Sequence, residues 1–349
     1  MRPRETPVGD PGYGLAMTIT DAPIATRPAH RRRLTRTLLI WLLVVPAAIW
    51  FVIRGFGLER DRFIQLIAFT PYVAAWSVLP ALIALAARRW GAAAVAVLTA
   101  FGLAMGVVPR ALPNLDRGPG SGVEITVMTA NLLFGGADPA SVVRLVREND
   151  VAILAVQELT VPATQALGAA GLADLLPYRS VDAEAGASGS GLYSRFPIAD
   201  PGSSRTEGGF LQAYATVQVP GATPIRTESA HPLAPAVPES FDGWRSDLAG
   251  QPQADPGGTP RILLGDFNST LDHKLLRDLI KSGYRDAADT TGKGWIGTWG
   301  PYDGDPIPPV TIDHVLADER IGIRDVEVHG VTGSDHRAVM ATLTIPENE

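Results

Sequence analysis

Three apolar segments near the start of the chain constrain its fold more than any other feature. Thr37 to Gly55 carries its only charge near the end, whereas Phe63 to Ala87 and Trp90 to Val108 are uncharged over 25 and 19 residues. A helix of about 20 apolar residues crosses a hydrocarbon core of roughly 30 Å, and a soluble helix of that length rarely lacks charge. We therefore expect three transmembrane helices, over residues 37–55, 63–87 and 90–108.

The placement of arginines predicts how these helices are oriented. Five arginines lie within residues 27–36, and Arg88 and Arg89 fill the second loop. Because positive loops stay in the cytoplasm, we expect a cytoplasmic N-terminus, a multi-pass protein of the cell membrane and an extracytoplasmic C-terminal domain. Residues 1–36 are typical of a disordered basic tail and residues 109–121 of a linker. The first apolar segment could instead be a cleaved signal peptide, but the charged stretch before it is long and two more apolar segments follow.

Charge separates the two parts of the chain. Residues 1–117 carry 14 arginines and 6 acidic residues, whereas residues 118–349 carry 16 basic and 30 acidic residues. Such an acidic domain is a poor match for duplex nucleic acid, which is bound through Lys and Arg. The absence of cysteine excludes disulfides, thiolate metal sites and cysteine nucleophiles. The apolar segments hold almost no ionisable groups, so a transporter is not expected.

From Val123 onward, strand-like and helix-like stretches alternate. "VEITVMTANLL", "VAILAVQEL" and "RILLGDFN" are typical of strands, whereas "PASVVRLVREND" and "DHKLLRDLIKSGYRDA" show the helical spacing of apolar residues. This mixture predicts an α/β domain over residues 122–349, in which helices cover the sheets.

Polar side chains recur where the expected strands end. They are Asn131, Glu158, His231, Asp266, Asn268, Asp313, Asp335 and His336. Strand ends are where side chains from several strands can meet, and in a continuing strand Asp266 and Asn268 would point to the same side. Each residue also has a simpler explanation. Asn131 could close a turn, Glu158 could pair with a surface arginine, and "GDFN" could form an Asx-type turn.

This ordered set resembles the endonuclease/exonuclease/phosphatase superfamily. The motifs span residues 124–345 and read "TANLLFG", "AVQEL", "GLYSRFPI", "SAHPLAP", "LLGDFNST", "GTWG", "TIDHVLA" and "GSDHRAV". The resemblance implies a four-layer α/β sandwich, with two packed mixed sheets flanked by helices. "HPLAP" followed by Trp244 to Leu248 is similar to a membrane-anchored bacterial branch, which includes a teicoplanin-resistance membrane protein of vancomycin-resistance clusters.

The resemblance also implies a divalent-metal-dependent phosphoric ester hydrolase that uses Mg²⁺ or Mn²⁺. The implied metal ligands are Asn131, Glu158 and Asp335, and the implied catalytic residues are His231, Asp266, Asn268, Asp313 and His336. Asp266 would orient or deprotonate the attacking water, with Asn268 beside it. His336, oriented by Asp313, would contact the phosphate, and His231 would donate to the developing charge from the other side.

Two departures from the family pattern affect the choice of function. Leu133 stands where many members have an acidic residue, and Ala234 where nucleases often have asparagine. The favoured function is therefore a membrane-anchored hydrolase that acts outside the cytoplasm on a membrane lipid, a lipid-linked phosphate or another cell-envelope phosphate or pyrophosphate. The first alternative function is an extracytoplasmic nuclease, and the second alternative is a non-catalytic envelope binding protein. No protein partner is indicated. Trp295, Trp299 and Tyr302 could form an apolar rim near the site or belong to the core.

Overall fold

The N-terminal part of the chain is helical. The computed structural model describes residues 1, 27–300 and 307–348, and three helical segments in it are long and apolar enough to cross a membrane: Arg33–Phe56, Arg62–Ala86 and Trp90–Ala111. The first lies in α1 (Arg27–Phe56), and the last comprises α4 (Trp90–Val107) and the 3₁₀ turn η2 (Val108–Ala111). Helix α1 begins inside the expected tail, because arginine and leucine favour helix. Residues 2–26 of that tail lie outside the described residues.

A 3₁₀ turn interrupts the second apolar segment, which the sequence predicts as one helix. It consists of α2 (Arg62–Leu66), η1 (Ile67–Phe69) and α3 (Thr70–Ala86). Pro71 has no N–H to donate to the carbonyl of Ile67, so the α-helical ladder cannot continue there. The Oγ1 of Thr70 donates to that carbonyl instead, at 2.6 Å. The short helix α2 is thereby separated from the long helix α3.

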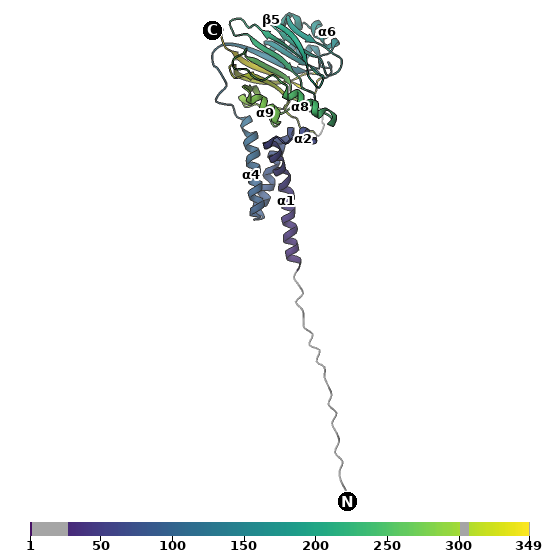
Figure 1. Cartoon of the computed structure of the whole chain (residues 1–349), viewed down its shortest axis with the longest axis vertical. Coiled ribbons are helices and arrows are strands. Elements are labelled where there is room, and N and C mark those ends of the chain that lie inside the picture. Colours follow the sequence, from purple (N-terminus) through teal and green to yellow (C-terminus); the bar gives the residue numbers. More distant parts are fainter. Residues whose placement is uncertain (2–26, 301–306, 349) are drawn as a thin grey trace. The chain divides into compact units, whose positions relative to one another are not determined.

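The C-terminal domain contains two six-stranded mixed sheets (Figure 1). The first has the order β11–β12–β1–β2–β4–β3, with β1 Val123–Asn131, β2 Val151–Gln157, β3 Tyr178–Asp182, β4 Ser190–Ser194, β11 Gly322–Gly330 and β12 Arg337–Ile345. The second has the order β5–β6–β7–β8–β10–β9, with β5 Ile198–Arg205, β6 Leu211–Val217, β7 Ile225–Ala230, β8 Arg261–Asp266, β9 Tyr284–Asp286 and β10 Asp313–Asp318. The neighbours β1 and β2, and β7 and β8, are parallel.

Successive residues of the central strands face different cores. Val127 of β1 packs between the two sheets, whereas Met128 packs under the helices of the first sheet. Strand β8 alternates in the same way, since Leu263 faces the helices of the second sheet and Leu264 faces the first sheet. The first sheet is covered by α5 (Pro139–Glu148), α6 (Val161–Ala169) and α7 (Leu172–Leu175). The second sheet is covered by α8 (Phe241–Ala249) and α9 (Lys274–Lys281). The remaining helices of the described part are η3 (Pro238–Ser240) and α10 (Ala287–Thr291). The expected four-layer sandwich is confirmed.

From Ile40 onward, the apolar helices and the α/β domain form one compact unit, in which α2 lies beside α8 and α9 (Figure 1). The buried carboxylate of Asp272 joins them: Arg54 of α1 donates to it at 2.5 Å, and Arg110 of η2 at 2.6 and 2.9 Å. The indole N–H of Trp295 donates to the carbonyl of Val107 at 2.8 Å. Buried ion pairs and hydrogen bonds therefore hold the domain against the helices, in addition to the covalent connection through residues 109–121.

Candidate active site

The residues singled out in the sequence come together at one edge of the sandwich. The parallel pair β1 and β2 and the parallel pair β7 and β8 each bring two carboxyl ends to that edge. Asn131 ends β1 and Asp266 ends β8, while Glu158 and His231 directly follow β2 and β7. Strand β10 runs antiparallel to β8, so its first residue, Asp313, lies opposite Asp266.

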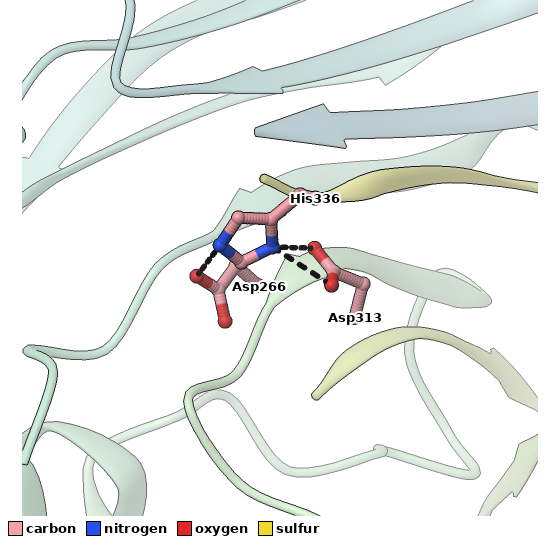
Figure 2. A group of neighbouring side chains, drawn as sticks. All are labelled: Asp266, Asp313 and His336. Carbon is pink, nitrogen blue, oxygen red and sulfur yellow. Dashed lines mark hydrogen bonds and ion pairs between the residues drawn. The ribbon is translucent and has the colours of Figure 1, made fainter. Parts of the chain in front are cut away.

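His336 lies between two carboxylates. Figure 2 shows its two ring nitrogens pointing toward different aspartates. Nδ1 donates to the carboxylate of Asp313 at 2.9 and 3.1 Å, and Nε2 lies 3.7 Å from Oδ2 of Asp266. All three side chains are buried. Because bulk water cannot screen these charges, the two carboxylates act strongly on the imidazole.

Electrostatics keep His336 protonated at neutral pH. Burial alone would lower the pKa of His336, but Asp313 and then Asp266 outweigh it and raise the pKa to about 10. Burial raises the pKa of Asp266 to about 7, against the attraction of the charged His336. The site therefore holds a cationic imidazole next to a carboxyl group that can gain or lose a proton near neutral pH.

His231 approaches Asp266 from the other side as a neutral imidazole. Its Nε2 lies 3.8 Å from Oδ2 of Asp266. Burial, followed by the charge of His336, lowers the pKa of His231 to about 3. Its backbone N–H donates to Oε1 of Gln212 at 2.8 Å, and its ring packs at 4.6 Å from the ring of Phe210. Two histidines of opposite protonation state thus flank one carboxylate oxygen.

Asn131 connects Asp266 to Glu158. Its Nδ2 donates to Oδ2 of Asp266 and to Oε1 of Glu158, both at 3.1 Å. Its Oδ1 accepts from the N–H of Leu133 at 2.9 Å, so the simpler prediction of a turn is also correct. Glu158 accepts a second hydrogen bond, at 2.6 Å, from the N–H of Phe134. These contacts aim Glu158 into the site rather than toward a surface arginine.

Asn268 is placed by a turn, which corrects the expectation from strand alternation. Strand β8 ends at Asp266, and Asn268 has a left-handed φ of 47°. The N–H of Asn268 donates to Oδ1 of Asp266 at 2.8 Å, which is the Asx-type turn given above as the simpler explanation. The Nδ2 of Asn268 donates to the carbonyl of Pro232, next to His231, at 3.0 Å. Asp266 therefore holds the turn with Oδ1 and presents Oδ2 to the site.

Asp335 has one carboxylate oxygen in use and one without a partner. Its Oδ2 accepts from the indole N–H of Trp299 at 2.9 Å. Its Oδ1 is buried, and no described residue makes a hydrogen bond to it. The neighbouring Ser334 donates to the carbonyl of Asn131 at 2.8 Å, which ties this loop to the end of β1. A buried carboxylate oxygen without a partner is costly unless a cation or water satisfies it.

Two sets of residues at this edge offer metal-ligating atoms. Within the described part of the chain, Asp266, Asp313 and His336 form the one group whose ligand atoms all lie within 4.8 Å of one another, and it could hold a metal ion. A histidine ligand must be neutral, so a cation at this group would have to displace the proton that Asp313 and Asp266 favour on His336. The oxygens of Glu158, Asn131 and Asp335 are the ligand type that a hard divalent cation prefers. The unpartnered Oδ1 of Asp335 fits such a cation.

Some residues that position the site were not predicted from the sequence. Gln212 holds the backbone of His231, and Oγ1 of Thr298 accepts from the N–H groups of Ile312 and Asp313, both at 3.0 Å. Thr298 belongs to the "GTWG" motif, which was a usable signal, whereas nothing local marks Gln212. Of the residues considered for an aromatic rim, Trp299 reaches the site through Asp335, whereas Trp295 contacts α4. Tyr302 lies outside the described residues.

Comparison with known proteins identifies a family whose model covers this edge. The sequence matches the model of the Endonuclease/Exonuclease/phosphatase family over residues 128–336. No curated protein matches it. The match extends from β1 to the histidine that precedes β12, so it includes every residue of the candidate site. The resemblance to the teicoplanin-resistance branch remains a prediction.

Several solved structures share the fold. They include an endonuclease/exonuclease/phosphatase from Beutenbergia cavernae (16% identity, TM-score 0.51, 64% of this chain and 72% of that chain covered). TDP2 from D. rerio in complex with a single strand DNA product (15%, 0.52, 63% and 99%) and SmcL (15%, 0.50, 63% and 99%) are similar to the same extent. The chain belongs to the endonuclease/exonuclease/phosphatase family, whose members are metal-dependent phosphoester hydrolases.

Proposed function

We propose that this protein is a membrane-anchored hydrolase that acts outside the cytoplasm on a lipid-linked or cell-envelope phosphate or pyrophosphate. The observation that carries this proposal is the contact between the active-site loop and a membrane segment. The loop that begins with Asn268 continues to His273, whose Nε2–H donates to the carbonyl of Ile64 in α2 at 2.8 Å. Because α2 and α3 together make up a span that is apolar enough to cross a membrane, this contact supports a reaction centre close to a bilayer surface.

In the proposed reaction, an attacking water gives its proton to Asp266. Oδ1 of Asp266 is held by the turn at Asn268, so Oδ2, which also accepts from Nδ2 of Asn131, is the oxygen that would serve as the base. The pKa of Asp266, about 7, suits proton transfer near neutral pH. The cationic His336, oriented by Asp313, donates from Nε2 to a phosphoryl oxygen. His231 faces the same carboxylate and donates to the charge that develops as the phosphoester bond breaks.

The proposed cofactor is Mg²⁺ or Mn²⁺. Glu158 and Asp335 would hold it through carboxylate oxygens, since Oδ1 of Asp335 has no partner among the described residues. Asn131 presents its Nδ2 to Glu158 and its Oδ1 to the N–H of Leu133, so it would ligate the ion only after its amide group turned. A bound divalent ion would neutralise the charge on the phosphoryl oxygens. Asn131 contacts both Glu158 and Asp266, so it relates the position of the metal ligands to that of the base.

An extracytoplasmic nuclease is the second candidate. It is favoured by the structural similarity to TDP2, whose solved structure contains a single strand DNA product. The acidic charge of residues 118–349 argues against it, because nucleic-acid binding depends on neutralising phosphates. The same site chemistry would serve either substrate, so only the substrate test separates them.

The test uses the full chain in nanodiscs with Mg²⁺ or Mn²⁺. Lipid pyrophosphates, phospholipids, nucleotides, and single- and double-stranded DNA are supplied in parallel, and phosphate release or strand cleavage is measured. Asp266→Asn is the inactive control, and Asp318→Asn at the far end of β10 is the matched control that should stay active. We expect metal-dependent phosphate release from a lipid substrate. Cleavage of DNA alone would establish the nuclease instead, and no turnover of any substrate would refute the proposed function.

A further inference from the structure

An apolar pocket adjoins the active site on the side of the membrane helices. Its volume is about 320 Å³, within the range of small-ligand sites. Asn268 and Trp299 line it from the catalytic domain, and Ile64 of α2 and Ala68 and Phe69 of η1 line it from the helices. We call it the inner pocket. Trp299 also bonds to Asp335, so this pocket begins at the residues proposed to handle the phosphate.

A second apolar space continues from the inner pocket between the membrane helices. This outer groove has a volume of about 410 Å³ and is lined by Val78 of α3, Ala100 and Ala104 of α4, and Trp295 of the domain. Ala68 and Val310 line both spaces, so the two spaces adjoin at these residues. The small alanine side chains of α4 leave room between the helices that larger residues would fill.

The outer groove lies at membrane depth. Val78, Ala100 and Ala104 belong to segments that are apolar enough to cross a bilayer. Trp295 is half exposed and hydrogen-bonded to the carbonyl of Val107 near the end of α4. A tryptophan at the end of a membrane helix typically marks the interface between hydrocarbon and water. The groove is thus open to the layer in which lipid chains lie.

The chemistry of the lining selects an apolar occupant. The outer groove has two charged residues, Arg110 and Asp272, which are hydrogen-bonded to each other at 2.6 and 2.9 Å, and Arg54 is a second partner of Asp272. The histidine of the inner pocket, His273, has Nε2 bonded to the carbonyl of Ile64 and Nδ1 accepting from the N–H of Thr270 at 2.9 Å. The charged side chains of the lining are therefore hydrogen-bonded to each other, and the rest of both linings is uncharged.

Resting on the proposed function, we infer that the inner pocket and the outer groove bind the hydrocarbon chain of a lipid phosphate or pyrophosphate substrate. The chain enters from the bilayer between α3 and α4, passes Ala68 and Val310, and leaves the head group at Asn268. The substrate class is thereby narrowed to esters with one long, flexible apolar chain at the phosphate. A head-group phosphate without such a chain lacks the contacts that this path provides.

Binding is tested by photo-cross-linking, independently of turnover. The full chain in nanodiscs is illuminated with hexadecyl phosphate that carries a diazirine in its chain, and the labelled peptides are mapped by mass spectrometry. We expect label on peptides that contain Ala68, Ala104 and Val310, and loss of label when unlabelled hexadecyl phosphate competes. Label distributed over the exposed helix faces, for instance around Leu98, would overturn the inference. So would cross-links between two copies of the chain at Val310, which would assign the groove to a dimer.

A variant at the junction tests the path during turnover. Ala68→Trp fills the point where the two spaces meet, whereas Leu66→Trp adds an indole at an exposed position two residues away. We expect Ala68→Trp to lower the ratio of hexadecyl to propyl pyrophosphate hydrolysis by roughly tenfold or more, and Leu66→Trp to leave it unchanged. An unchanged ratio in Ala68→Trp would refute the path. If no ester is hydrolysed by the wild type, the proposed function fails, and the cross-linking result still decides whether the path binds a chain.

Discussion

Replacing Asp313 by asparagine removes one of the two negative charges that keep His336 protonated. The pKa of His336 is about 10, against an ordinary value of 6.5, although burial opposes the charge. This difference corresponds to roughly 5 kcal/mol in favour of the imidazolium. Asp313 contributes the larger part, because its oxygens lie 2.9 and 3.1 Å from Nδ1 while Asp266 lies 3.7 Å from Nε2. If at least half of that free energy is lost, the pKa falls by roughly 2 pH units.

The assay is the pH dependence of kcat/KM of the full chain with saturating Mg²⁺. Since the protonated His336 is the active form, we expect the alkaline limb to lie near pH 10 in the wild type and near pH 8 in Asp313→Asn. At pH 9 the variant should lose about tenfold in rate relative to the wild type through this shift alone. The matched control is Asp318→Asn, which removes an ion pair with Arg320 at the other end of β10 and should keep the wild-type profile. A slow Asp313→Asn enzyme whose alkaline limb stays near pH 10 would refute the reasoning.

Three further predictions concern the base, the metal ligands and the contact between domain and helices. Burial raises the pKa of Asp266 to about 7, so kcat/KM should fall as pH drops below about 7. A cation bound nearby would move this fall to a lower pH, and a rate that stays constant down to about pH 4 would contradict Asp266 as the base. Glu158→Gln should weaken Mn²⁺ binding, followed by electron paramagnetic resonance titration, by at least about tenfold, and unchanged affinity would remove Glu158 from the ligand set. Asp272→Asn leaves Arg54 and Arg110 without their buried counter-charge and should lower the free energy of unfolding by about 3–5 kcal/mol, whereas Asp278→Asn in the exposed pair on α9 should change it by about 0.5 kcal/mol or less. Burial alone would raise the pKa of Asp272, but Arg110 and Arg54 outweigh it and lower that pKa. The stability that the Asp272 charge contributes is therefore present above its ordinary pKa and is lost as pH falls through the lower folded value. The thermal unfolding curves of the wild type and Asp272→Asn should converge in strong acid, and a gap that persists there would argue against a charge effect.

Local patterns of the chain were enough to predict the main elements. The uncharged runs require apolar surroundings, so the three helical spans follow from their length alone. Alternation within β1 and β8 follows from the two cores that these strands separate. Strand β5 was not predicted, because Pro201 and Gly202 are typical of a loop. It exists as an edge strand, where a missing N–H is tolerated.

The identity of the site residues was also available from the sequence, because each stands at, or within two residues of, the start or end of a strand. Their states and partners were not available. That His336 is a cation and His231 is neutral depends on which carboxylate each ring faces after the two sheets have packed. The position of Asn268 depends on a left-handed turn that ends β8, and strand alternation gave the wrong direction for its side chain.

By itself, the sequence determined the apolar spans, the α/β class of the domain and the polar residues of its active edge, because these depend on periodicity and on neighbours along the chain. Only the tertiary structure decided where that edge lies relative to the apolar helices. The ion pair between Arg54 and Asp272 joins residues 218 positions apart, and the apolar path past Ala68 and Val310 is formed by side chains from both parts. Contacts at such separations exist only after the chain has folded, since no local pattern of residues specifies which distant surface will meet them.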